Sequence, residues 1–478
     1  MNLQRFECQN NHLRKILAES SLGEIILELI DHLPKKDQGW IKNFIEMHNF
    51  DALNKKNKEQ IDFILFFSNI LYQDDILLLN IVDNSETVVE VDFLAKKNTI
   101  VLRAKIVGKE ANPLELESID LSYSDYKDEI NWEPNLTIQE ACQELDNRFR
   151  RMAKLDIFSG TVLIAKSGKI IFSKAIGQAS KRYKMLNTHQ TKFNLGSMNK
   201  IFTAAAILQL YEQEKLKLSD CVQEYLPSFP NGDRITIHHL LTHTSGLGSF
   251  WNKRWEEKFR QIRSIDNYLD LFIDDELLFQ PGERFEYSNA GFIVLGKVIE
   301  AISGKSYDEY IKEAVYTPAK MKNTGQYDID REIPDLAMGY THYDIFDQFH
   351  PEMKFNNFLK VPVKGSSAGG GYSTIEDLFN FSIALEEERL LKRETLNLMK
   401  NPSPDALANN YGYGCQVGTF GNLPFYGHGG GTEGVATMLM IFPTVKMVLA
   451  ILSNYCPLYE ISAEYQIEMI IKQLFPKA

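Results

Sequence analysis

The sequence predicts two domains: a small α+β domain, followed by a larger domain in which an antiparallel sheet frames a helical middle. Three observations predict this. At 478 residues the chain is longer than a domain with a single hydrophobic core usually is. Helix-like and then strand-like patterns fill its first quarter, and strand-like runs recur at both ends of the remainder. A hydrophobic fraction of 44% is enough for two cores rather than disorder.

The first domain is predicted over residues 1–125. Helical periodicity covers 22–33 and 58–71, and it gives way to four runs with the short period of strands. These runs are 76–81, 87–94, 99–107 and 114–121. Helices followed by a meander of strands indicate an α+β unit with a curled antiparallel sheet. No cluster of acids, histidines or cysteines marks a site in it.

A polar linker is predicted over 126–136, and the second domain over 137–478. Thr137 is expected to cap a helix over 138–152, before a hairpin that turns at Lys166-Ser167-Gly168. The expected strands are 161–165, 169–175, 412–417, 423–427, 435–442 and 446–452, with a final helix over 459–474. Strands at both ends of the domain imply one sheet shared by its two termini, with the apolar helical run after residue 197 in the middle layer.

Charge and cysteine content exclude several function classes. A net charge of −12 argues against nucleic acid and anionic membranes as partners. The five cysteines are widely spaced and never form Cys-x-x-Cys, so neither a disulfide framework nor a zinc site is indicated. Charged residues interrupt the first twenty positions, and no apolar run approaches the roughly 18 residues of a membrane span. We therefore expect a cytoplasmic chain without membrane insertion.

The strongest chemical signal is Ser197-Met198-Asn199-Lys200, which lies at the start of a broadly apolar helical run. Side chains at i and i+3 share a helical face, so the hydroxyl and the amine can meet if the helix begins at the serine. The same spacing occurs once more, at Ser124 to Lys127, where no apolar helix follows. Context therefore favours Ser197 as a nucleophile with Lys200 beside it.

Two further motifs could complete such a site. Tyr287-Ser288-Asn289 precedes a predicted helix, and among 21 tyrosines only this one has asparagine two residues later. His428-Gly429-Gly430-Gly431 follows a strand, where glycines let a substrate lie against the backbone and an NH group can serve an oxyanion. Gly-x-Ser-x-Gly, the nucleophile elbow of α/β hydrolases, does not occur.

In chain order these three motifs resemble those of the serine β-lactamase and penicillin-binding protein superfamily, and most closely its class C-like branch of esterases and D-amino-acid peptidases. The resemblance covers roughly residues 137–478. It extends to Leu240-Leu-Thr-His-Thr-Ser-Gly-Leu247, Pro318-Ala-Lys-Met-Lys-Asn-Thr324, Ser366-Ser-Ala-Gly-Gly-Gly-Tyr-Ser373 and Leu452-Ser-Asn454. It implies a β-lactamase/transpeptidase-like fold, with an antiparallel sheet flanked by helices and an all-helical subdomain.

The resemblance also implies catalytic roles. Ser197 would be acylated, Lys200 would hold and polarise it, and Tyr287 would act as base toward the serine and then toward water. Asn289 would orient the lysine and hold a substrate carbonyl. The NH groups of Ser197 and Gly431 would form the oxyanion hole. For this work we expect the pKa values of the Tyr-Lys pair, ordinarily about 10 and 10.4, to shift toward neutrality.

One departure concerns the strand motif. Penicillin-interacting members usually carry Lys-Thr/Ser-Gly where this chain has His428-Gly429-Gly430. His428 and Gly430 are predicted to support substrate binding, with the imidazole near half-charge around pH 6.5 in place of a permanent cation. The exchange also removes a hydroxyl donor. It lowers the expectation of β-lactamase or D-Ala-D-Ala carboxypeptidase activity.

Other signals have structural interpretations. His239 and His243 have an i, i+4 spacing that metal ligands use, but no third ligand is evident, so no metal is predicted. Gly369-Gly370-Gly371 lacks the lysine of a P-loop and is interpreted as a turn beside the active site.

The first domain weakly resembles the cone-shaped NTF2-like or cystatin-like domains of related hydrolases. A docking or dimerisation lobe, giving a homo-oligomer, is its favoured role.

The sequence thus predicts a serine hydrolase that forms an acyl-enzyme on Ser197 and acts on a small carboxylic ester or amide, with no cofactor. A D-amino-acid peptidase or weak β-lactamase is the alternative enzyme. A non-catalytic, self-associating scaffold that kept the fold is the alternative from another class. The substrate stays open, because the loops 251–275 and 344–364 that would shape its pockets carry no readable code.

Overall fold

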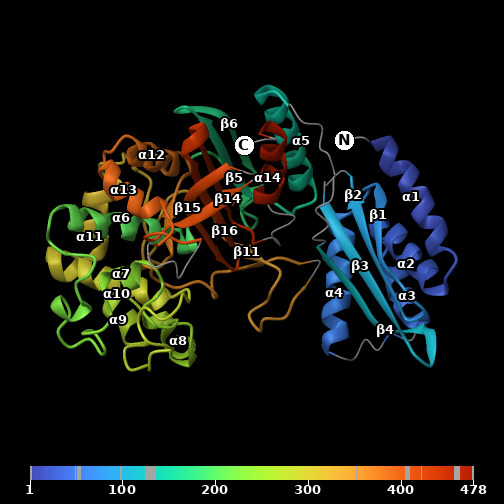
Figure 1. The fold of residues 1–478 in the computed structure, drawn as a ribbon, viewed down its shortest axis with the longest axis horizontal. Coiled ribbons are helices and arrows are strands. Elements are labelled where there is room, and N and C mark those ends of the chain that lie inside the picture. The colour runs from blue at the N-terminus through green and yellow to red at the C-terminus, as the bar shows by residue number, and fades with distance from the viewer. Residues whose placement is uncertain are drawn as a thin grey trace. The chain divides into compact units, whose positions relative to one another are not determined.

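The computed structural model describes residues 3–48, 50, 55–96, 100–123, 136–350, 353–403, 410–420, 423–456 and 463–475. The chain forms two compact units (Figure 1). The first comprises Met1–Phe158, Thr341–Phe355 and Pro457–Lys477, and the second comprises Ser159–Tyr340 and Asn356–Cys456. The predicted linker and the second Ser-x-x-Lys pattern at Ser124 lie outside the described residues, apart from Leu136. The predicted boundaries at 125 and 137 stay predictions.

A four-stranded antiparallel sheet in the order β1-β2-β3-β4 forms the centre of the first unit. Each of the four strand-like runs is a strand: β1 (Ile76–Asn84), β2 (Val88–Ala95), β3 (Ile100–Lys109) and β4 (Asn112–Tyr123). The helices that precede them are α1 (Leu3–Leu17), α2 (Ser21–His32), α3 (Gln38–Met47) and α4 (Lys55–Ile70). The predicted α+β architecture is confirmed, whereas the NTF2-like topology stays a prediction.

The first unit's sheet is apolar on both faces, as the two-residue alternation of a strand allows. Leu78, Phe93 and Leu102 share a core with the helices, whereas Leu77 and Leu94 belong to a small cluster apart from it. Figure 1 shows α1, α2 and α3 together on one side of this sheet. Burying the apolar stripe of each helix against the sheet is the main stabilisation available to such a small unit.

Two helices distant in sequence also pack together in the first unit. They are α5 (Ile138–Lys154) and α14 (Ala463–Leu474), and Arg148 Nη1 donates to Gln466 Oε1 across them at 3.0 Å. The predicted cap of α5 is confirmed as a capping box. The Thr137 hydroxyl accepts from the Glu140 backbone NH, and the Glu140 carboxylate accepts from the Thr137 NH at 2.8 Å.

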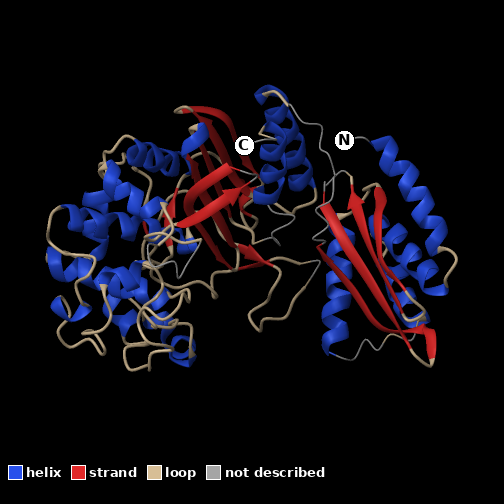
Figure 2. Ribbon diagram, viewed as in Figure 1, coloured by secondary structure: helices blue, strands red, loops and turns tan. Residues whose placement is uncertain are grey.

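The second unit is built on a six-stranded antiparallel sheet in the order β14-β15-β16-β17-β5-β6 (Figure 2). Its strands are β5 (Gly160–Lys166), β6 (Lys169–Ile176), β14 (Gln416–Phe420), β15 (Leu423–Thr432), β16 (Val435–Phe442) and β17 (Met447–Ser453). β17 pairs with β5, with Ala450 opposite Leu163, so the prediction that both ends of the domain share one sheet is confirmed. The hairpin turn has left-handed φ angles at Ser167 and Gly168, as a two-residue loop requires.

Helices cover this sheet and form a separate helical region. They are α6 (Asn199–Glu212), α7 (Ile237–Leu241), α8 (Lys253–Lys258), α9 (Ile265–Leu269), α10 (Asn289–Ser303), α11 (Tyr307–Ile311), α12 (Ile375–Glu386) and α13 (Arg393–Lys400). Short strands precede α6 or lie between the later helices: β7 (Gln178–Ser180), β8 (Met185–Leu186), β9 (Phe193–Asn194), β10 (Gly325–Gln326), β11 (Tyr340–Thr341), β12 (Phe355–Asn356) and β13 (Gly371–Ser373). α6 contacts β15 on one side and α10 on another, and nearly every residue along it is buried. The predicted middle position of this helix is confirmed.

The predicted strand at 412–417 is wrong for its first four residues, because β14 begins at Gln416. The preceding residues form a turn that crosses α6. Gly414 has a φ of +67° there, and a Cβ added to it would lie 2.2 Å from the Cβ of Ala204. Only glycine fits this crossing, and that close approach overrides the local strand pattern. Within the described part of the chain, we find no helix with the length and apolar content needed to span a bilayer.

Candidate active site

Ser197 lies in a single 3-10 turn, Gly196–Met198, directly before α6. The sequence predicts an α-helix that begins at the serine, so the turn is tighter than expected, although it still directs the chain into α6. Two contacts fix the turn: Asn194 Oδ1 accepts from the Gly196 NH at 2.8 Å, and the Leu195 NH donates to the Gly371 carbonyl at 2.8 Å. The serine is therefore held by backbone geometry as well as by its helix.

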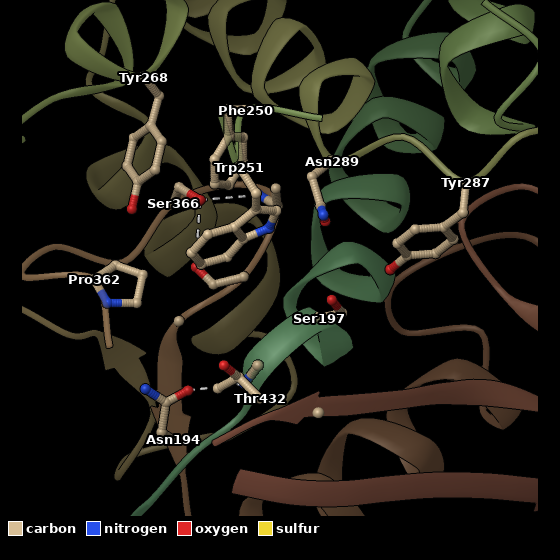
Figure 3. Close-up of a pocket in the computed structure, with 15 residues that line it drawn as sticks. Asn194, Ser197, Phe250, Trp251, Tyr268, Tyr287, Asn289, Pro362, Ser366 and Thr432 are labelled. Atoms are coloured by element: carbon tan, nitrogen blue, oxygen red, sulfur yellow. Dashed lines mark hydrogen bonds between the residues drawn. The ribbon is translucent and has the colours of Figure 1, made fainter. Parts of the chain in front are cut away.

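Strand β15 passes very close to this turn. A Cβ added to Gly430 would lie 1.9 Å from the Leu195 carbonyl oxygen, and one added to Gly196 would lie 3.1 Å from the Gly431 nitrogen. Gly430 has no room for a side chain, and at Gly196 the tight approach is combined with a φ of +52°, which favours glycine. The glycine run therefore brings the backbone of Gly431 beside that of Ser197, and both residues line one cavity (Figure 3).

Lys200 is fully buried one turn after the serine. Its Nζ donates to Asn289 Oδ1 at 2.8 Å and to the Ala368 carbonyl oxygen at 2.6 Å. Burial holds the pKa of Lys200 well below its ordinary value, as the sequence predicts. A neutral amine has two NH donors, and here both are used by these two acceptors. Its lone pair is then left free to take a proton.

Tyr287 precedes α10, and Figure 3 shows its hydroxyl directed toward Ser197. Burial raises the pKa of Tyr287 to about 12, against the opposing effect of a hydrogen bond with Ser197. The ring is 39% exposed, so it is the surroundings of the hydroxyl that disfavour the phenolate. The expected shift of this pKa toward neutrality is wrong. Of the Tyr-Lys pair, only the lysine shifts in that direction.

His428 is 1% exposed, and it does not line the cavity that Gly431 and Thr432 line. Its Nδ1 contacts the Gly429 carbonyl at 2.5 Å, and its Nε2 contacts the Tyr411 hydroxyl at 2.9 Å. A carbonyl only accepts, so the proton is on Nδ1 and Tyr411 donates to Nε2. Burial lowers the pKa of His428 to about 3. The expected half-charge near pH 6.5 is wrong.

The cavity beside Ser197 has a volume of about 370 Å³. On the side of the cavity away from Tyr287, Phe250, Trp251, Tyr268 and Pro362 form what we call the aromatic wall (Figure 3). Among the described residues, none that lines this cavity carries a charge. The loops 251–275 and 344–364, predicted to shape the pockets, supply three of these four residues. Such a cavity suits an uncharged group.

Gly369 and Gly370 also line the cavity, and Gly370 has a φ of +84°. The predicted place of this glycine run beside the site is confirmed, but the turn lies at Ser367 and Ala368, and Gly371 already begins β13. Sequence reasoning missed the carbonyl of Ala368, which directly precedes the run and holds Lys200. It also missed Asn199, whose Oδ1 accepts from the Gly371 NH at 3.2 Å and so ties the run to α6. A backbone carbonyl leaves no mark in residue types, so the first omission had no available signal.

The two histidines with metal-like spacing do not form a metal site. The ring of His239 accepts from the Thr236 NH at 3.2 Å, whereas that of His243 accepts from the Ser288 NH at 3.0 Å. Residue 243 has a φ of +59°, so the helical register that would align the two rings is lost. No group of three or more metal-ligating side chains occurs among the residues for which placements are given.

Comparison with known proteins identifies relatives of this site. The family model described as Beta-lactamase matches residues 145–465. Penicillin-binding protein 4* of Bacillus subtilis (strain 168) is 31% identical over 336 residues, which cover 66% of this chain and 72% of that protein. A crystal structure of a penicillin-binding protein from Bacillus halodurans has a TM-score of 0.60 at 30% identity, covering 71% of this chain and 99% of the other.

A further solved structure is an octameric penicillin-binding protein homologue from Pyrococcus abyssi. Its TM-score is 0.59 at 26% identity, and the match covers 70% of this chain and 78% of that one. The family match begins at residue 145, within α5, and leaves the first 144 residues without a counterpart in that model. The β-lactamase/transpeptidase-like fold predicted from the motifs is confirmed.

Proposed function

This chain belongs to the Beta-lactamase family and is a serine hydrolase, and from that premise we propose that it forms an acyl-enzyme on Ser197 and hydrolyses an uncharged carboxylic ester or small amide. The observation that carries the proposal is the buried Lys200, held by Asn289 and the Ala368 carbonyl with its lone pair unused. An amine kept neutral in this way can serve as a base at neutral pH.

The proton path runs through Tyr287. Its hydroxyl contacts Ser197, and the lysine Nζ lies 4.9 Å from the centroid of its ring. The phenol accepts the serine proton while its own proton passes to Lys200, and the freed oxygen attacks the substrate carbonyl. When the tetrahedral intermediate collapses, the bond to the leaving alcohol or amine breaks and that group takes the proton back from Lys200 through Tyr287. The same groups then take a proton from water in deacylation and return it to the Ser197 oxygen as the acid product leaves. Because burial disfavours the phenolate, the phenol acts as a relay and the lysine as the final acceptor.

The remaining predicted residues stabilise the oxyanion, orient the lysine or affect which substrate is favoured. Backbone NH groups of Ser197 and Gly431 stabilise the oxyanion, which the close approach of β15 to the nucleophile turn supports. Asn289 orients the lysine. The aromatic wall holds the acyl or alcohol group by apolar contact, and the neutral His428 offers no cation to a substrate carboxylate. Uncharged esters are therefore favoured over carboxylated substrates.

The decisive test is turnover of p-nitrophenyl acetate by the full chain, beside Ser197→Ala and the matched control Ser124→Ala, which alters the second Ser-x-x-Lys pattern. We expect Ser197→Ala to lose at least ~10³-fold in kcat/KM and Ser124→Ala to keep the rate. A fluorophosphonate probe should label the wild type and Ser124→Ala but not Ser197→Ala. Equal turnover by Ser197→Ala would overturn the proposal, and an unlabelled, inactive wild type would favour the non-catalytic scaffold.

A second candidate is a D-amino-acid peptidase or weak β-lactamase, favoured by relatives named penicillin-binding proteins. Nitrocefin and a D-alanyl amide, compared with p-nitrophenyl acetate in the same assay, separate the two. We expect the ester to have the higher kcat/KM by about 100-fold, because the carboxylate of nitrocefin meets no cation at His428. The reverse order would replace the ester assignment with the peptidase one.

For the first unit we propose an NTF2-like domain that mediates self-association. Its helices precede a four-stranded antiparallel sheet, which is consistent with that topology. The octameric assembly of the Pyrococcus abyssi homologue makes a homo-oligomer a reasonable expectation. Light scattering of the full chain tests this, and a monomer at micromolar concentration would contradict it.

A further inference from the structure

His243 makes three contacts at Tyr287: one with the residue before it, one with the residue after it and one with its ring. Its backbone carbonyl accepts from the NH of Glu286 at 2.9 Å, and its ring Nδ1 accepts from the NH of Ser288 at 3.0 Å. Its ring lies 4.3 Å from the ring of Tyr287, centroid to centroid, at an interplanar angle of 36°. One residue therefore binds the main chain immediately before and after the tyrosine and also contacts its side chain.

This arrangement has two local energetic costs, one in the backbone of His243 and one in its ring. His243 adopts a φ of +59°, a left-handed conformation that is uncommon for residues other than glycine, although histidine is among the residues that adopt it more readily. Because Nδ1 accepts, the proton of this neutral ring is on Nε2, and that buried donor has no hydrogen-bond acceptor. A residue that combines a strained backbone with an unsatisfied buried donor is typical of a functional site.

The surroundings of the ring keep it neutral and fixed. It is completely buried and packs against the rings of Tyr411 and Phe292, at centroid distances of 4.6 and 5.1 Å. Burial holds its pKa well below the ordinary value. A neutral ring can accept from the Ser288 NH, whereas an imidazolium could not. The contact to the main chain beside Tyr287 therefore persists across the physiological pH range.

We propose that His243 is a positioning residue that holds the phenol of Tyr287 against Ser197, through the hydrogen bonds on both sides of the tyrosine and the contact between the rings. The inference rests on the proposed relay role of Tyr287. His243 does not line the cavity, so the proposal has it act through the tyrosine. A displacement of the phenol by about 1 Å would be enough to cost on the order of 100-fold in rate.

Two substitutions in the full chain separate the acceptor from the ring. His243→Asn keeps an acceptor near the place of Nδ1 and tolerates the left-handed backbone, whereas His243→Phe keeps a ring and removes the acceptor. With p-nitrophenyl acetate, we expect kcat to fall less than 10-fold in His243→Asn and about 100-fold in His243→Phe. KM should stay within about 3-fold of wild type in both. His243→Gly, which also removes the acceptor but relieves the backbone, replaces His243→Phe if that variant does not fold.

The discriminating measurement is the rate of fluorophosphonate labelling in a Tyr287→Phe background. If His243 acts through the Tyr287 hydroxyl, adding His243→Phe to Tyr287→Phe should slow labelling no more than about 3-fold further. A full additional 100-fold loss, or equal rates for His243→Asn and His243→Phe, would overturn the positioning role. If Tyr287→Phe itself reacts at the wild-type rate, the proposed proton path fails, and the positioning role fails with it. A slow Tyr287→Phe beside a fast His243→Phe refutes the positioning role alone.

Discussion

The two sides of the cavity beside Ser197 are built on different principles. On one side, Lys200 and Asn289 belong to regular helices and are joined by a 2.8 Å hydrogen bond. On the other, three of the four residues of the aromatic wall lie in loops, and one of them, Trp251, is 46% exposed, whereas Tyr268 lies in α9. The catalytic side is held by directional bonds, and the aromatic wall mainly by packing.

This difference separates the chemistry from its specificity. Hydrogen bonds to a buried amine tolerate little change, because an unsatisfied buried polar group costs about 1–3 kcal/mol and the geometry of proton transfer is lost with it. Apolar contacts between loops can be exchanged at smaller cost. Substitutions on the catalytic side should therefore abolish turnover, whereas those on the aromatic wall should change which ester is preferred.

The largest effect is expected for Lys200→Met, which fills similar space but removes the base. We expect kcat/KM to fall at least ~10³-fold while the melting temperature changes by only a few degrees, because replacing a buried lysine with an apolar side chain relieves its desolvation. Steady-state kinetics and thermal unfolding measure the two. Lys215→Met, at an exposed lysine, is the matched control and should change neither. Substantial activity in Lys200→Met would move the base to another residue.

The pH dependence of kcat/KM tests the role of Lys200 in the wild-type protein. Because burial lowers the pKa of Lys200 and raises that of Tyr287 to about 12, kcat/KM should fall as pH decreases through the lysine pKa, and should show no alkaline decline caused by Tyr287 until near pH 12. A profile recorded between pH 5 and 10, corrected with Ser197→Ala, measures this. A decline above pH 8 that tracks the tyrosine would contradict the assigned states.

The lysine should also appear in stability measurements. Between its lowered native pKa and the unfolded value of about 10.4, the unfolded chain binds one more proton than the native chain. The free energy of unfolding should therefore rise with pH across that window, by up to about 1.4 kcal/mol per pH unit. Urea titrations at several pH values should show this slope in the wild type and a flatter one in Lys200→Met. Identical slopes would indicate that Lys200 is charged in the native state.

Much of the fold and the catalytic side could be predicted because local patterns determine them. The strand runs of the first unit, the capping box at Thr137 and the pairing of the two ends of the second unit's sheet all follow from periodicity and turn chemistry. Ser197, Lys200 and Tyr287 meet as their motif spacing and family resemblance imply. What could not be predicted depends on tertiary surroundings: the Ala368 carbonyl, and the directions in which burial shifts the pKa values of Tyr287 and His428.

A smaller effect is expected on the aromatic wall. Trp251→Ala should lower the preference for p-nitrophenyl butyrate over acetate by about 10-fold in kcat/KM, because the methylene groups lose an apolar surface worth roughly 1–3 kcal/mol. The rate with acetate should stay within about 3-fold. Tyr183→Ala is the matched control, since it removes a 71% exposed aromatic ring that does not line the cavity. A large loss with both esters would mean that Trp251 belongs to the catalytic side.

The smallest effect on activity is expected for Tyr411→Phe. This substitution tests whether His428 contributes to the reaction or only to the stability of the fold. Tyr411 donates to Nε2 of His428 at 2.9 Å, and neither residue lines the cavity. Losing that donor leaves a buried nitrogen unsatisfied, so the free energy of unfolding should fall by about 1–3 kcal/mol while kcat/KM stays within about 3-fold. Urea unfolding and the ester assay measure the two. If activity instead falls more than 30-fold at unchanged stability, His428 serves the reaction directly and the aromatic wall is not alone in selecting the substrate.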